Sequence, residues 1–385
     1  MSDALRESRD LCAALKTWLI DDAFTLWWEH GADHELGGFH ERLKLDGTAT
    51  GEPRRARLHP RQIYSFSVAD ELGWEGPSEK AVQHALDFYL PNYRRDDHLM
   101  RTLVDASGKA LDDRVVLYDQ AFALLGYASA YDTLADDTLR DDARDLHDQL
   151  RARMSNPLLG FEESTPRALP LLSNSHMHLF EASLAWMDLD HDGRWQTLAS
   201  QIVQLALTRF IDPATGFLRE FFDENWQPVP GNEGRITEPG HQFEWAWLLL
   251  RWVERTGDVS ARDVALRLID LGEKHGFDSQ RGVAITSLLT DRRVRDPIAR
   301  LWPQTERLKA ACIAAERTND PQYWAMAASA ARGLMKYLDT PVRGLWRDKM
   351  LPNGTLVEEP APASSFYHIV CAIAEMEHTL QRFAP

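Results

Sequence analysis

The most constraining feature of this sequence is an internal repeat of about sixty residues. Six segments that are apolar around most of a helix recur along the chain, and each opens with polar or ionisable residues. One residue chosen from each opening cluster gives successive gaps of 58, 59, 63, 65 and 62 residues. Near-constant spacing of this kind indicates a repeated structural unit. The chosen residues are Arg61, Asp119, His178, His241, Glu306 and His368.

Each repeat is predicted to contain two helices of different character. Residues 138–154 carry apolar side chains at three-to-four spacing and mostly Asp or Arg elsewhere, which is typical of a helix with one face in water. Residues 241–252 are apolar on almost every side after the first turn, which is typical of a helix buried all round. One-sided helices are expected to begin near Leu11, Ser78, Thr138, Gly193, Asp258 and Asp320. Fully apolar helices are expected to begin near Arg57, Leu117, Asn174, Gly240, Thr305 and Ser364.

Six helical hairpins of this kind can stack into an open solenoid or close into a ring. A solenoid needs polar capping repeats at its ends, yet the last repeat ends on the apolar segment 367–376. We therefore predict an all-α fold, an (α/α)6 barrel of six helical hairpins, with residues 1–385 as a single catalytic domain. The apolar helices would run parallel inside it, so their polar clusters would meet around one cavity. Short β-hairpin loops, for example at 37–47 and 216–228, are expected to wall this cavity at one rim.

Composition excludes several classes of partner. Asp and Glu number 59 against 43 Lys and Arg, for a net charge of −16, whereas a nucleic-acid-binding protein needs concentrated basic charge. No apolar stretch approaches the roughly 20 residues of a membrane span, and the charged first twenty residues do not form a signal-peptide core. Three scattered cysteines, Cys12, Cys312 and Cys371, are typical of free thiols in a reducing compartment. We expect a cytoplasmic monomer or homodimer that acts on a small molecule.

The residues gathered at the predicted rim suit proton transfer. Imidazole titrates near neutral pH and can both accept and return a proton, and His178, His241 and His368 recur at similar places in the repeat. An arginine and the ends of parallel helices stabilise a developing oxyanion, so an enediolate fits better than an oxocarbenium ion. Glu244 lies one helical turn after His241, where it either orients that imidazole or binds a backbone group. Six histidines do not fall at this position of the repeat and are expected at the surface or in loops: His30, His34, His40, His59, His84 and His98.

Other catalytic chemistries find little support in the motifs. The chain has no HExxH, no CxxC pair, no glycine-rich phosphate loop and no GxSxG elbow. His176 and His178 point about 200° apart in a regular helix, so joint metal ligation is not expected and only one of them can face the cavity. We predict no metal and no cofactor.

Taken together, the opening clusters make the chain similar to the N-acylglucosamine 2-epimerase superfamily, which includes mannose isomerases, sulfoquinovose isomerase and cellobiose 2-epimerases. The resemblance runs through essentially the whole chain. Its carriers are HPRQIYSF around Arg61, LYDQAF (117–122), NSHMHLFEA (174–182), EPGHQFEWAWLL (238–249), LWPQTERLKA (301–310) and SSFYHI (364–369).

This resemblance implies an (α/α)6 barrel and a cofactor-independent interconversion of sugars through a cis-enediolate. It implies His368 as the base at C2, His241 as the group that opens the sugar ring, and Arg61 as the group that binds near O1 and O2. Glu244 and Glu306 would support the histidines and the sugar hydroxyls. The residues assigned to substrate binding are His178, Glu244, Glu306, Tyr118, Asp119, Asn174, Trp302 and Gln304.

The motif variants after His241 and before Glu306 favour the mannose and sulfoquinovose isomerase branch. We therefore expect an aldose–ketose isomerase that converts D-mannose to D-fructose. A 2-epimerase of the N-acylglucosamine or cellobiose type remains an alternative, as does a glycoside hydrolase that uses paired carboxylates. Two arginine trios could grip a phosphate or sulfonate on the sugar, although solvated loops are the favoured interpretation: Arg54, Arg55, Arg57 and Arg292, Arg293, Arg295.

Overall fold

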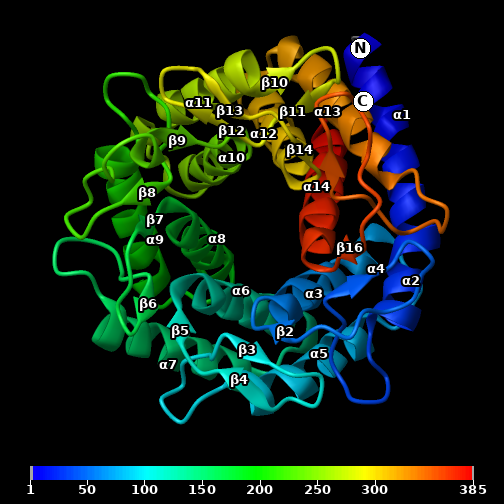
Figure 1. Cartoon of the computed structure of the whole chain (residues 1–385), viewed down its shortest axis with the longest axis vertical. Helices are drawn as coiled ribbons and strands as arrows, with labels where there is room; N and C mark the ends of the chain where they lie inside the picture. Colours follow the sequence, from blue (N-terminus) through cyan, green and yellow to red (C-terminus); the bar gives the residue numbers. More distant parts are fainter. Residues whose placement is uncertain (1–2, 384–385) are drawn as a thin grey trace.

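The two helix types form two concentric layers in the computed structural model, which describes residues 3–383 (Figure 1). One-sided helices form the outer layer: α1 (Asp3–Trp18), α5 (Ser78–Tyr93), α7 (Asp137–Met154), α9 (Arg194–Leu205), α11 (Ser260–Gly276) and α13 (Pro321–Leu338). Apolar helices form the inner layer: α3 (Leu58–Ser67), α6 (Leu117–Leu134), α8 (Ser173–Leu189), α10 (Pro239–Thr256), α12 (Trp302–Thr318) and α14 (Ser364–Arg382). The chain folds as the predicted (α/α)6 barrel, because six inner helices bury their apolar surfaces against one another and the outer ring.

Short irregular helices complete the helical part. The helix α2 (Phe24–Leu26) lies between α1 and α3, and α4 (Ala69–Leu72) directly follows α3. Three π-helical turns and one 3₁₀ turn extend helices or loops: η1 (Leu19–Ala23), η2 (Trp27–Gly31), η3 (Ala206–Phe210) and η4 (Glu233–Arg235). No helix of the described residues is long and apolar enough to cross a membrane.

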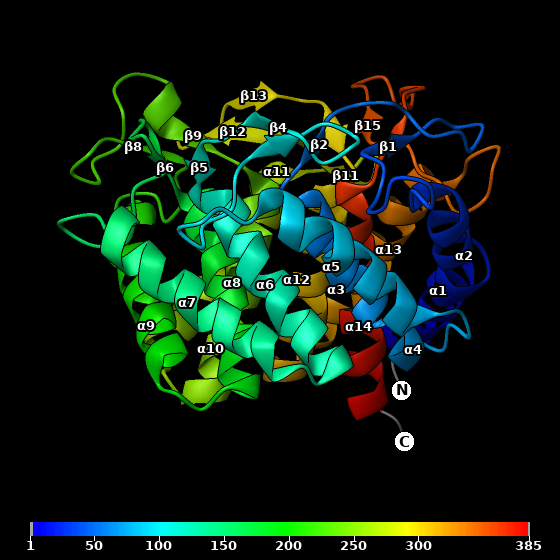
Figure 2. The same cartoon turned by 90° about the horizontal axis from the view of Figure 1, so that it is seen from below.

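All long connections from an outer to an inner helix lie at one end of the barrel, where the strands gather (Figure 2). The strands join neighbouring repeats more than they form local hairpins. Two ladders have three strands: β2 (Arg54–Arg55), β3 (Leu103–Val104) and β4 (Ala110–Asp112); then β13 (Val294–Asp296), β12 (Ser287–Leu289) and β9 (Ile236–Thr237). The two-stranded ladders pair β5 (Val115–Val116) with β6 (Ser164–Thr165), β7 (Leu171–Leu172) with β8 (Phe221–Phe222), β10 (Phe277–Asp278) with β11 (Val283–Ala284), β14 (Ala299–Arg300) with β15 (Lys349–Met350), and β1 (Arg42–Leu43) with β16 (Ala361–Pro362).

Five of these connections are anchored to the inner helix that follows them by a side chain near its start. In each case the side chain accepts a hydrogen bond from a backbone N–H of the loop: His59 from Phe39, Gln120 from Met100, His176 from Phe161, Gln242 from Leu218, and Gln304 from Ala284. Gly38 and Gly160, both with positive φ, let the backbone approach, since a Cβ there would lie 2.4 and 2.8 Å from the imidazole nitrogens of His59 and His176. His59 is fully buried, so its expected surface position was wrong.

Candidate active site

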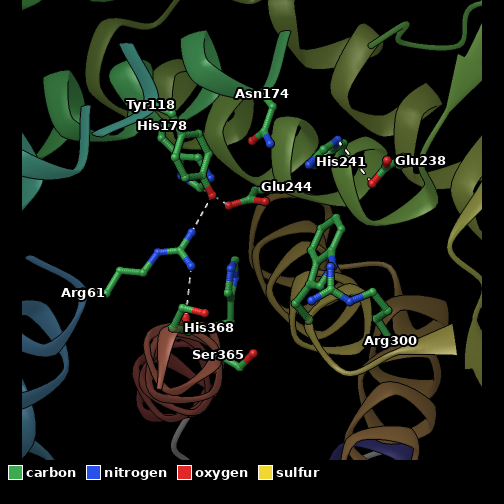
Figure 3. Close-up of a pocket in the computed structure, with 12 residues that line it drawn as sticks. Arg61, Tyr118, Asn174, His178, Glu238, His241, Glu244, Arg300, Ser365 and His368 are labelled. Carbon is green, nitrogen blue, oxygen red and sulfur yellow. Dashed lines mark hydrogen bonds and ion pairs between the residues drawn. The ribbon is translucent and has the colours of Figure 1, made fainter. Parts of the chain in front are cut away.

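A cavity of about 260 Å³ opens where the inner helices begin, which is a size suited to a monosaccharide (Figure 3). Eight of the residues proposed from the sequence line it: Arg61, Tyr118, Asn174, His178, His241, Glu244, Trp302 and His368. Four further lining residues were not among those proposed from the sequence: Glu238, Arg300, Ser364 and Ser365. The repeat therefore brings side chains from all six inner helices to one place.

His368 is held as a neutral base. Its Nδ1 lies 2.8 Å from the Glu306 carboxylate, and because a carboxylate only accepts, Nδ1 carries the hydrogen and Nε2 keeps its lone pair. Burial, with Arg61 and Lys309 nearby, puts the pKa of His368 well below its ordinary value. The Nζ of Lys309 lies 2.7 Å from the other oxygen of Glu306, and both residues are fully buried. This chain of contacts fixes the imidazole and keeps it unprotonated.

His241 is the opposite case. Its Nδ1 lies 2.8 Å from Glu220 and 3.8 Å from Glu238. Burial acts to lower its pKa, but the carboxylates of Glu220, Glu238 and Glu244 outweigh it and raise the pKa of His241 to about 10. His241 is therefore an imidazolium at neutral pH and can donate a proton. The centre of the Trp302 ring lies 5.0 Å from that of the His241 ring and 5.9 Å from that of the His368 ring, so both imidazoles lie close to one indole.

The third histidine has a more structural environment. The Nδ1 of His178 lies 3.1 Å from Glu181, whose other oxygen accepts a hydrogen bond from the Tyr367 hydroxyl. Burial lowers the pKa of His178 to about 4, so it is neutral. As predicted, only one histidine of the HMH segment faces the cavity, because His176 instead binds the loop backbone.

Arg61 places its guanidinium beside the base. Its Nη2 donates to the Tyr118 hydroxyl at 2.6 Å and its Nη1 to the Ser364 carbonyl at 3.2 Å. Its Cζ lies 4.1 Å from the centre of the Phe122 ring. A cation held this firmly next to His368 can stabilise negative charge that develops on substrate oxygens.

Three buried polar atoms of the cavity-lining residues have no hydrogen-bond partner among residues 3–383. They are Nε of Arg61, Oε1 of Glu244 and Oδ1 of Asn174. Burial, with Glu306 nearby, raises the pKa of Glu244 well above its usual range. Unpaired buried polar atoms cost free energy, and the hydroxyls of a sugar are well suited to pair with them.

Two buried triads have the spacing of metal ligands: His178 with Glu181 and Glu244, and Glu244 with Glu306 and His368. Apart from Glu244, the residues of both triads already have partners of another kind. Lys309 supplies a positive charge to Glu306, and each imidazole Nδ1 binds a carboxylate. These atoms fit an ion-paired proton-transfer network better than a metal centre.

The structure corrects or refines the predictions for four individual residues. Asp119 and Gln304 do not line the cavity, because Asp119 pairs with Arg57 at 3.2 Å and Gln304 binds the backbone of Ala284. Glu306 lies behind His368 and positions it. Glu244 does not orient His241; Glu220 does, from the loop that contains β8. No periodic signal marks Glu220 or Arg300, because both lie in the irregular loops.

Two concentric layers of helices hold paired imidazoles and carboxylates around a small polar cavity, which is the arrangement of a helical-barrel enzyme. Residues 37–372 match the family described as N-acylglucosamine 2-epimerase (GlcNAc 2-epimerase). The chain belongs to this family, as the opening clusters indicated, and is a sugar isomerase or epimerase.

The relatives come from both activities of the family. The chain is 48% identical over 377 residues to a mannose-6-phosphate isomerase of Rhizobium meliloti (strain 1021), covering 96% of this chain and 97% of the relative. It is 28% identical over 382 residues to a D-mannose isomerase of Thermobifida fusca, covering 89% and 88%. The solved structure of a cellobiose 2-epimerase from Spirochaeta thermophila DSM 6192 superposes with a TM-score of 0.87 at 21% identity, covering all of both chains. This last likeness shows the shared fold.

Proposed function

We propose that the protein interconverts an aldose and a ketose, with D-mannose and D-fructose, free or phosphorylated, as the substrate pair. The observation that carries this proposal is the pair of imidazoles close to the Trp302 ring in one cavity, one neutral and one protonated. The names of two relatives, a mannose-6-phosphate isomerase and a D-mannose isomerase, support mannose as the sugar.

The reaction divides between these two groups. His241 donates a proton to the ring oxygen and takes up the proton of the C1 hydroxyl, so the ring C1–O bond breaks, an aldehyde forms and His241 is protonated again. Nε2 of His368 then takes the proton from C2, and the C–H electrons form the C1–C2 double bond of a cis-enediolate with its negative charge on O1. Arg61 stabilises this charge while the proton of the C2 hydroxyl passes to O1. His368 returns its proton to C1 and the C2–O bond becomes the ketone carbonyl, so no electron donor or acceptor is consumed.

A panel of sugars tests the proposal directly. The enzyme is incubated with mannose, mannose 6-phosphate, glucose, cellobiose and N-acetylmannosamine, in the presence and absence of a chelator, and the products are separated by chromatography. We expect a ketose from one of the mannose substrates, with or without chelator. A 2-epimer as the sole product, reducing ends released from a glycan, or activity restored only by a divalent metal would contradict the proposal.

The base is tested by substitution. His368→Asn should lower kcat by about 10²- to 10⁴-fold, the usual contribution of a general base, with an unchanged circular dichroism spectrum. His191→Asn is the matched control, because His191 is exposed and lies outside the cavity. Wild-type turnover by His368→Asn would remove the assigned base.

A further inference from the structure

Two arginines line the cavity, and they differ in how their donors are used. Both terminal nitrogens of Arg61 are occupied by Tyr118 and Ser364, and the side chain is buried. Arg300 binds Asp348 through Nε alone, at 3.1 Å. Within the described residues 3–383, its two terminal nitrogens have no hydrogen-bond partner. Figure 3 shows the Arg300 guanidinium pointing into the cavity across from Arg61.

The fold holds Arg300 in this position. It ends β14, opposite Lys349 of β15, two residues before Trp302 opens α12. Its backbone oxygen accepts a hydrogen bond from Gln304, and Asp348 fixes one side of the guanidinium. The Arg300 side chain is 42% exposed, whereas Arg61 is only 5% exposed as a residue, so Arg300 lies at the mouth and Arg61 in the depth. A guanidinium held at one edge presents its other edge to a ligand.

The other candidate arginines do not reach the cavity. Arg54 pairs with Asp33, Arg55 with Glu41 and Arg57 with Asp119. The second trio lies on and around β13, outside the cavity lining. Neither trio lines the cavity, so neither is placed to bind a group on the sugar. Arg300 belongs to neither trio and is the arginine with free donors at the cavity.

The proposed reaction fixes which end of a sugar would meet Arg300. His368 and His241 act on C1 and C2 and are both buried. In a pyranose ring C5 lies opposite C2, so C6 points away from the carbon that His368 deprotonates. With C2 in the depth of the cavity, a substituent on C6 would lie toward the mouth, where Arg300 is.

We propose that Arg300 binds an anionic substituent on C6 of the sugar, so that the substrate class is a hexose 6-phosphate. This inference rests on the proposed isomerase function. The two free terminal nitrogens of the Arg300 guanidinium can each donate a hydrogen bond to one of two oxygens of a phosphate monoester. Asp348 balances the positive charge of Arg300, which is close enough to Glu238 to influence its pKa. Burial raises the pKa of Glu238 to about 7, so this carboxyl group can take up a proton when a phosphate arrives.

Substrate preference tests the assignment. We define preference as kcat/KM for mannose 6-phosphate divided by kcat/KM for mannose. Arg300→Met should lower this preference at least about tenfold, mainly through KM for the phosphorylated sugar, because a hydrogen-bonded ion pair to phosphate is lost. Arg300→Lys keeps the positive charge but lacks the planar pair of N–H donors, so its preference should lie between those of the wild type and Arg300→Met. Arg293→Met is the matched control, since Arg293 is exposed and pairs with Asp291, and it should keep the wild-type preference.

Inorganic phosphate alone provides a second measurement that does not depend on turnover. Calorimetric titration should show phosphate binding to the wild type that is weakened at least about tenfold in Arg300→Met and unchanged in Arg293→Met. Equal preference in wild type and Arg300→Met, or equal phosphate affinity, would overturn the role of Arg300. If neither sugar is converted, the isomerase proposal fails, and the phosphate titration still decides whether Arg300 binds an anion.

Discussion

At the residue scale, the chemistry depends on which charges surround each imidazole. His368 and His241 both bind a carboxylate through Nδ1, yet one is neutral and the other protonated. The difference lies in the remaining neighbours, because Lys309 and Arg61 act on His368, while Glu238 and Glu244 act on His241. The same side-chain type is therefore present in two protonation states in one cavity, as the proposed acid and base require.

Lys309 tests this account of His368. The residue is fully buried, its Nζ lies 2.7 Å from Glu306, and its charge lowers the pKa of His368. In Lys309→Met, loss of that charge should raise the pKa of His368 and move the acid limb of the kcat/KM profile to higher pH. The lone buried carboxylate should also lower the free energy of unfolding by about 3–5 kcal/mol.

The readouts are the pH profile of isomerisation and chemical denaturation. Lys274→Met, at an exposed position in α11, should change neither. A purely structural Lys309 would lower stability and leave the acid limb in place, and that result would contradict the electrostatic role.

At the element scale, the helices were predictable and their rotational phase was not. The apolar repeat identified all six hairpins, because burying an inner helix requires apolar residues on every face. The cavity is lined from these helices by residues that include Arg61, Tyr118, His178, Glu244 and His368, with Glu306 directly behind His368. Asp119, proposed because an ionisable residue seemed the natural partner of the others, directly follows Tyr118 but pairs with Arg57 and does not line the cavity. Phe122, one turn after Tyr118, packs against Arg61 and His178.

The loop anchors form a second repeated pattern, and His176 offers a test of it. Its Nε2 accepts a hydrogen bond from the backbone N–H of Phe161, and its Nδ1 donates one to the backbone carbonyl of Leu172. A glutamine amide can make both bonds, as Gln120 and Gln304 do in their repeats. Burial lowers the pKa of His176 to about 4 in the folded protein, against an ordinary value of 6.5. The unfolded chain therefore binds the proton more readily, and stability falls as pH drops from 6.5 to 4.

His176→Gln should fold and lose this share of the acid destabilisation, roughly 3 kcal/mol by pH 4, while losing some ring packing at pH 7. The measurement is the free energy of unfolding by denaturant at several pH values between 4 and 7. His191→Gln, at an exposed site, should keep the wild-type dependence. An unchanged slope in His176→Gln would show that this imidazole is not buried in its neutral form.

At the scale of the whole molecule, closure of the ring makes the site. A ladder links the loops of neighbouring repeats at every junction, and β1 with β16 joins the first repeat to the last. Lys16 of α1 also pairs with Glu377 of α14 at 2.9 Å. The repeat period predicted this closure and the meeting of distant histidines. It could not predict Glu220, Glu238 or Arg300, because loop residues reach the cavity through pairings that span two repeats and leave no period.

The central claim is that His368 and His241, 127 positions apart in the chain, perform one proton transfer through an enediolate. The most direct measurement is isomerisation of mannose or mannose 6-phosphate in deuterated water, followed by NMR of the ketose. The account predicts deuterium at C1 of the ketose, lost in His368→Asn. Complete transfer of the original C2 hydrogen to C1, with no solvent deuterium over many turnovers, would indicate a hydride shift and contradict it.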